Sequence, residues 1–132
     1  METRIYTERK SYVKYDDNHY LLYLNETEIP NYIPEVRDNE PAPAPCLAYQ
    51  YEGIEVDGGT LIEAAEANYE TFVNGLIRNN YTQSEVEAIQ SNMIVSMTDT
   101  ENERALEFQQ EWKSYQEYRN MCKSNAKIVL GL

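Results

Sequence analysis

The 132-residue sequence lacks any apolar run of the roughly 18 residues that a transmembrane helix needs. The first ten residues, METRIYTERK, also lack the apolar core of a secretory signal peptide. Both absences predict a cytoplasmic protein that makes no contact with a membrane. They leave open that the protein is later built into a larger particle.

Cysteine and histidine are scarce, with only Cys46, Cys122 and His19. The two cysteines are too far apart for zinc or redox motifs, so reduced thiols are expected. A metal site needs three or four converging ligands, and His19 has only Asp16 and Asp17 close by. The sequence therefore predicts no metal site, no cofactor and no catalytic residue. A pairing of His19 with a cysteine in three dimensions stays open.

Positive charge is also scarce, since 11 Lys and Arg face 23 Asp and Glu, a net charge of −12. Residues 15–103 carry only two cations against 18 acids, whereas residues 1–14 and 104–132 are each net +2. Nucleic-acid binding is disfavoured because phosphate contacts need clustered Lys and Arg. The acidic middle suits a solvated surface, a basic partner, or mimicry of a nucleic acid.

The N-terminal half, residues 1–63, has the composition and pattern of β-structure. Strand-like runs at 11–15 and 19–24 flank a turn at 16–18, which predicts a β-hairpin. Two further strands are expected on either side of the Asp57-Gly58-Gly59 turn, at 47–51 and 60–63. All five prolines lie in 30–45, and the proline-rich segment 39–45 is expected to be an extended, exposed connector.

From residue 64 to residue 132 the apolar spacing becomes helical. Tyr69 begins a stripe that ends at Ile77 and predicts the first helix. Thr82 and Glu85 have the capping-box spacing that starts a second helix. A third helix is expected over 98–130, with caps at 98–100. The predicted class is α+β, with an antiparallel sheet in the N-terminal half and then three helices, as two parts or as one compact domain.

The last helix is the most informative segment because it is long and amphipathic. Its apolar positions follow 3-4-3-4 spacing from Ala105 to Val129, interrupted only at Arg119. Trp, Tyr and Arg are enriched at binding hot spots, so four residues are the candidate protein-binding set. These are Trp112, Tyr115, Tyr118 and Arg119. The alternative is that Trp112 and Tyr115 dock this helix on its own sheet.

The run Phe108-Gln-Gln-Glu-Trp-Lys-Ser-Tyr-Gln-Glu-Tyr-Arg119 resembles the C-terminal helix of small bacteriophage tail-fibre assembly proteins and related prophage proteins. The segment Asp57-Gly-Gly-Thr-Leu-Ile62, followed by helices, is similar to small prophage proteins. The resemblance implies a chaperone-like or accessory component of a phage tail, associated with the virion. It implies no catalytic residues.

These observations predict a non-enzymatic, protein-binding accessory or structural assembly factor. Its partner is expected to be another protein, or a second copy of the chain in a homo-oligomer, bound through the C-terminal helix. One alternative is an acidic inhibitor that mimics nucleic acid and occupies a basic protein. A second alternative is a small hydrolase, which requires a pocket where His19 meets a cysteine or paired acids.

Overall fold

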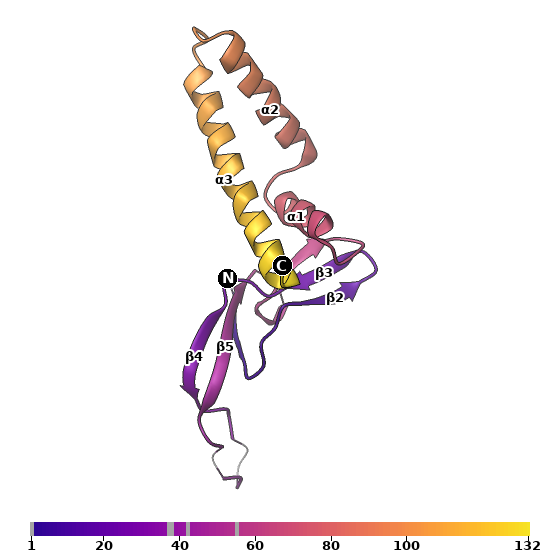
Figure 1. The fold of residues 1–132 in the computed structure, drawn as a ribbon, viewed down its shortest axis with the longest axis vertical. Coiled ribbons are helices and arrows are strands. Elements are labelled where there is room, and N and C mark those ends of the chain that lie inside the picture. Colours follow the sequence, from indigo (N-terminus) through magenta and orange to yellow (C-terminus); the bar gives the residue numbers. More distant parts are fainter. Residues whose placement is uncertain (1, 37–38, 42, 55) are drawn as a thin grey trace.

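The computed structural model describes residues 2–36, 39–41, 43–54 and 56–132. The predicted α+β class is confirmed: antiparallel strands form two three-stranded sheets in the N-terminal half, and three helices follow (Figure 1). The elements, in chain order, are β1 (Glu2–Tyr6), β2 (Tyr12–Asp16), β3 (His19–Leu22), β4 (Thr27–Tyr32), β5 (Cys46–Gly53), β6 (Thr60–Glu63), α1 (Tyr69–Arg78), α2 (Gln83–Thr98) and α3 (Ala105–Leu130).

The strands divide between sheets of order β1-β5-β4 and β2-β3-β6. The predicted hairpin is present, with Tyr12 opposite Leu22 in the β2–β3 pair. Strands β5 and β6 are neighbours in sequence but belong to different sheets. Between them Asp57 and Gly58 adopt the left-handed conformation, with φ of 59° and 75°, and redirect the chain from one sheet to the other.

Strand β4 extends through Pro30, the first of the five prolines. Proline has no N–H to donate, so it is tolerated only on edge strands and at bulges. Both conditions hold here, since β4 is an edge strand and its register with β5 shifts between Ile29 and Tyr32. The described residues of the connector, 39–41 and 43–45, are exposed as expected, whereas residue 42 lies outside the described part.

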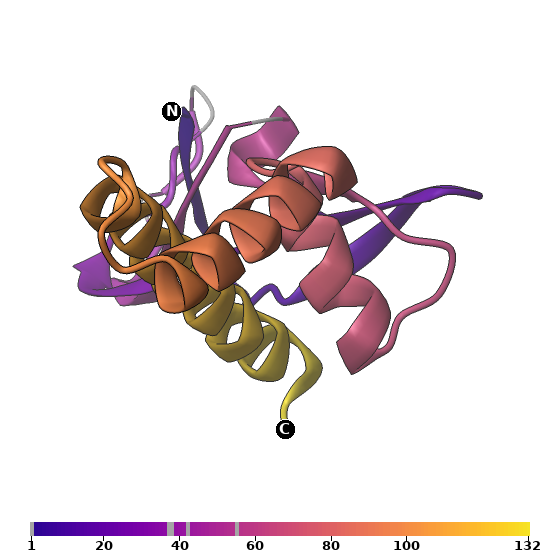
Figure 2. The same cartoon turned by 90° about the horizontal axis from the view of Figure 1, so that it is seen from above.

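The sheet β2-β3-β6 and all three helices share one apolar core. Leu22, Ile62 and Phe72 are almost completely buried in it. Helix α1 packs on this sheet against β6, with the C-terminal half of α3 beside it (Figures 1 and 2). The closest approach is at Gly75 in α1, where an added Cβ would lie 2.7 Å from the backbone oxygen of Glu63 in β6. Glycine there sets the distance between helix and sheet.

Helices α2 and α3 form an antiparallel hairpin that projects away from both sheets (Figure 1). The capping box at the start of α2 is present: Thr82 accepts from the Glu85 N–H, and the Glu85 side chain accepts from the Thr82 N–H. The buried positions of α3 include Ala105, Phe108, Cys122 and Val129, as the spacing predicted. The long helix thus spans the base of the molecule and extends beyond it.

The predicted start of the third helix is wrong, because α2 runs to Thr98 and α3 begins only at Ala105. The Thr98 hydroxyl donates to the backbone oxygen of Ile94 at 3.0 Å, within the last turn of α2, and does not cap a new helix. Asp99 follows α2 as its C-cap. The turn is then held by Asn102, whose side-chain oxygen accepts from the Arg104 N–H at 2.9 Å.

Replacing Gly75 by alanine should destabilise the protein although alanine favours helices by about 1 kcal/mol. The new methyl group would overlap the Glu63 carbonyl, and forcing α1 away from β6 should cost about 1–3 kcal/mol net. Urea unfolding would measure this loss. The matched control, Asn74→Ala, changes the adjacent exposed residue and should be neutral or slightly stabilising. A Gly75→Ala protein as stable as the control would contradict the close approach.

Candidate protein-binding surface and junction pocket

Helix α3 directs the four predicted contact residues towards different surroundings. Tyr115 is only 5% exposed and packs edge-on against Tyr81, with ring centroids 5.2 Å apart. The Tyr118 hydroxyl donates to the backbone oxygen of Leu76 in α1 at 2.8 Å. Trp112 and Arg119 are half-buried and keep part of their surface open to solvent. Within one chain, Tyr115 and Tyr118 therefore hold the helices together, and Trp112 also packs against the core beside the Tyr115 ring.

A groove of about 550 Å³ runs between α2 and α3, on the projecting hairpin. Tyr81, Ala88 and Ile89 supply its apolar lining. Glu85, Glu107 and Glu111 supply carboxylates, and Gln110 and Ser114 complete the lining. Arg104 already pairs with Glu107, at 3.0 Å, so Glu85 and Glu111 carry most of the free negative charge. Such a groove suits an apolar side chain that lies beside a cation.

The sequence pattern did not identify this groove. Its α3 residues, Glu107, Gln110, Glu111 and Ser114, fall at helical spacing next to the buried stripe. That spacing is visible in the sequence, but a polar row beside an apolar stripe is the ordinary outer face of any amphipathic helix. Only the pairing of α2 with α3 turns two such rows into one groove.

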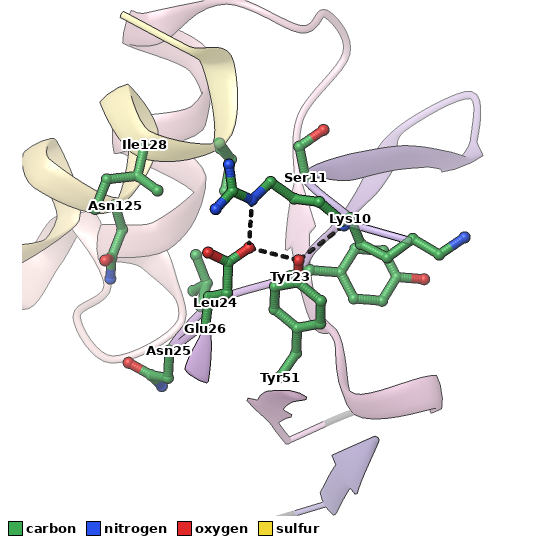
Figure 3. A pocket seen from close by; sticks show the side chains of 11 residues that line it. Lys10, Ser11, Tyr23, Leu24, Asn25, Glu26, Tyr51, Asn125 and Ile128 are labelled. Atoms are coloured by element: carbon green, nitrogen blue, oxygen red, sulfur yellow. Dashed lines mark hydrogen bonds and ion pairs between the residues drawn. The ribbon is translucent and has the colours of Figure 1, made fainter. Parts of the chain in front are cut away.

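A second pocket, also of about 550 Å³, lies where the two sheets meet the C-terminal end of α3 (Figure 3). Glu26 links its polar groups, because one carboxylate oxygen accepts from the Arg9 Nε at 3.1 Å and from the Tyr51 hydroxyl at 2.7 Å. The same hydroxyl accepts from the backbone N–H of Lys10 at 2.7 Å. Asn125 and Ile128 of α3 close one side of this junction pocket.

Tyr51 in the lining of the junction pocket, and Tyr6 packed against its ring, are held in the neutral form. Burial, followed by the hydrogen bond to Glu26, raises the pKa of Tyr51 to about 12 from an ordinary value of 10.0. Burial and the neighbouring Tyr23 raise the pKa of Tyr6 to about 12. A neutral phenol is a donor and acceptor but not a base near neutral pH. The pocket therefore offers hydrogen bonds and the cations of Arg9 and Lys10.

The residues required by the hydrolase alternative lie in separate places. His19 bonds Asp16 through Nδ1 at 2.8 Å beside the exposed β2–β3 turn. The backbone N–H of Asn18, and then His19, lower the pKa of that Asp16 carboxyl. Cys122 is buried among the helices, and burial raises the pKa of its thiol, which disfavours the nucleophilic thiolate. Cys46 lies at the start of β5.

Over the described ranges of the chain, no cluster of three or more His, Cys, Asp or Glu side chains is arranged to hold a metal ion. Within the same residues, no helix is both long enough and apolar enough to span a membrane.

Comparison with known proteins finds no matching family model, no matching curated protein and no matching solved structure. The resemblance of residues 108–119 to phage tail-fibre assembly proteins therefore stays a prediction.

The raised tyrosine pKa values predict a loss of stability in alkali. Because Tyr51 binds its proton more tightly in the folded chain, its contribution is complete below pH 10 and is lost as pH rises to about 12. Replacing Tyr51 by phenylalanine should make the fall in unfolding free energy over that range shallower, by up to about 1.4 kcal/mol per pH unit. Denaturant unfolding at several pH values would measure the slope.

The comparison of slopes is independent of any constant loss of stability caused by the missing hydrogen bonds. Tyr15→Phe serves as the control, since it removes an exposed hydroxyl from β2. Its unfolding free energy should depend on pH as that of the parent protein does. If the unfolding free energies of Tyr51→Phe and the parent protein fall with the same slope above pH 10, protonation of Tyr51 is not coupled to folding.

Proposed function

We propose that this protein is a non-enzymatic, protein-binding factor with a structural or assembly role, and that the α2–α3 hairpin is its contact element. The projection of the hairpin beyond both sheets carries the proposal (Figure 1). Its groove combines an apolar lining with carboxylates, and Met97 and Leu106 expose further apolar surface on the same two helices. Exposed apolar groups rimmed by charge are typical of protein contacts.

The charge of the hairpin indicates what kind of protein segment it takes. Residues 83–111 contain seven Asp and Glu and a single cation, Arg104. A groove between two helices is well matched to a third helix, whose side chains enter between the two rows. The best-fitting partner segment is thus an amphipathic helix that carries Lys or Arg beside its apolar stripe. This role belongs to the class of functions that the tail-fibre resemblance implies.

An acidic mimic of nucleic acid is a second candidate, favoured by the same concentration of carboxylates on the hairpin. The two candidates differ in what they require of the partner. A mimic binds through charge alone, and its affinity falls steeply with salt. A groove that takes a helix requires apolar side chains at helical spacing in addition to the cations.

A short Leu/Lys peptide that forms an amphipathic helix is a suitable probe. Fluorescence anisotropy of the labelled peptide should show saturable binding, at protein concentrations where the chain is monomeric. Ile89→Ser removes apolar lining from the groove and should weaken binding at least about ten-fold, or 1.4 kcal/mol. Glu111→Lys should weaken it similarly without disturbing the core. Ile94→Ser, on the same helix but outside the groove lining, should leave binding unchanged.

A Ser/Lys peptide of equal charge is the control for nonspecific attraction. If it binds as tightly as the amphipathic peptide, the groove is not a helix site, and the acidic mimic becomes the better explanation. If neither peptide binds, the protein-binding role of the hairpin groove is wrong. Melting temperatures of all variants show whether a loss of binding reflects unfolding.

A further inference from the structure

The junction pocket continues into a smaller neighbouring pocket along α3. This second pocket, of about 180 Å³, lies between α3, the end of α1, the end of β5 and the start of β6. Leu24, Asn25 and Asn125 line both pockets, so the two adjoin and form one space, the junction cleft. The α3 side of the junction cleft runs from Tyr118 to Ile128, which is about 15 Å of helix.

Hydrogen bonds between distant segments hold the walls of the junction cleft in place. The Glu52 N–H in β5 donates to the backbone oxygen of Leu24 at 3.2 Å. At the α1 end, the Tyr118 hydroxyl donates to the backbone oxygen of Leu76 at 2.8 Å. At the other end, the Tyr51 hydroxyl is fixed by its two hydrogen bonds. Because the chain itself fixes these walls, few side chains must be ordered when a ligand binds.

Three polar side chains of the junction cleft have no hydrogen-bond partner among the described residues. Thr60 is only 8% exposed and lines the smaller pocket. No completely buried side-chain polar atom of the described residues lacks a partner, so the Thr60 hydroxyl keeps an opening to solvent. The other two are the carboxamides of Asn25, after β3, and Asn125, on α3 (Figure 3). Groups at such depth are normally bonded, so a ligand can bond them in place of water.

The charges of the junction cleft cancel, which disfavours an ionic ligand. Among its lining residues, Arg9 and Lys10 are balanced by Glu26 and Glu52. The Arg9 guanidinium already pairs with Glu26, at 3.1 Å, so less of its charge is available to an anion. Phosphate groups and nucleic acids need clustered, unpaired cations. The cleft therefore suits a neutral ligand that carries hydrogen-bonding groups.

Exposed aliphatic side chains lie at both ends of the junction cleft. Ile54 and Met121 are 64% and 51% exposed in the smaller pocket, and Ile128 is 71% exposed in the junction pocket. Sugars and bases bind best on the open face of an aromatic ring. Aliphatic side chains instead suit the aliphatic side chains of a peptide, which gain free energy when both are removed from water.

We propose that the junction cleft binds a short, uncharged peptide segment of a partner protein in the extended conformation. Each peptide group carries one donor and one acceptor, and the carboxamides of Asn25 and Asn125 offer the matching groups. Aliphatic side chains near the two ends of the segment lie on Met121 and Ile128. At about 3.3 Å per residue, such a cleft takes about four or five residues. The site is separate from the hairpin groove and does not depend on the role proposed for it.

The neutral peptide acetyl-Leu-Ser-Ser-Leu-amide is a suitable probe, followed by NMR of the ¹⁵N-labelled protein. Titration should shift the side-chain NH₂ signals of Asn25 and Asn125 in a saturable way. Asn125→Leu keeps the size of the side chain but removes its donor and acceptor, and should weaken binding at least about ten-fold. The matched control, Asn120→Leu, changes an exposed residue of α3 that lines neither pocket and should bind as the parent does.

Thr60→Val tests the buried hydroxyl without changing the size of the side chain. Because this hydroxyl bonds no other described residue, its removal should leave the melting temperature unchanged while weakening the binding of the peptide about three-fold or more. A melting temperature that falls, with binding unchanged, would show that the hydroxyl serves the fold, and its role in the cleft would be wrong.

A peptide methylated on both serine nitrogens tests whether the backbone is recognised, because it lacks two N–H donors but keeps all its side chains. It should bind at least about ten-fold more weakly than the parent peptide. Equal binding of the two peptides would overturn the proposal, as would unchanged binding by Asn125→Leu. The absence of saturable shifts at millimolar peptide would overturn it as well. If the neutral sugar maltotriose saturates the cleft and the peptide does not, the cleft is a sugar site.

The hairpin variant Ile89→Ser separates this site from the hairpin groove. It should leave binding of the neutral peptide unchanged, and Asn125→Leu should leave binding of the Leu/Lys peptide unchanged. A loss of neutral-peptide binding in folded Ile89→Ser would place that peptide in the hairpin groove and overturn the junction cleft as its site. Failure of the neutral peptide alone leaves the proposed function of the hairpin standing.

Discussion

The apolar stripe of α3 is the feature on which the rest of the structure depends. Its C-terminal half, through Cys122, Ala126 and Val129, belongs to the core shared with α1 and the sheet β2-β3-β6. Its N-terminal half, with Ala105 and Phe108 buried, belongs to the hairpin with α2. One helix therefore anchors the hairpin to the base. Helix α2 makes most of its contacts with α3, so its attachment to the rest of the fold depends on that stripe.

Anchoring by one long helix has a consequence for function. A helix of 26 residues is about 39 Å long, and only part of it can lie over a small sheet. The remainder projects, and two projecting helices bury only the sides that face each other. The outer sides of α2 and α3 consequently stay accessible. The same geometry that limits the core creates the groove and leaves apolar side chains exposed on both helices.

The order and type of the elements could be predicted from local pattern. Alternation and turn residues identified β2 and β3, and the stripe from Tyr69 to Ile77 identified α1. The capping box at Thr82 and Glu85 identified the start of α2. The start of α3 was misplaced because Thr98 bonds the backbone within α2 as readily as it caps a new helix. No residue pattern within a strand indicates which of the two sheets it joins. Leu21 of β3 and Tyr51 of β5 are both apolar strand residues that could be buried in either sheet.

The sequence by itself determined the class of the fold, the C-terminal end of α3 and the spacing of the buried stripe along it. These follow from side-chain polarity and spacing, which act over a few residues. Tertiary structure alone decided that Tyr115 and Tyr118 pack inward, that Glu26 joins Arg9 to Tyr51, and that rows on α2 and α3 form one groove. Each of these depends on contacts between residues distant in the chain, and such contacts are set by how elements pack.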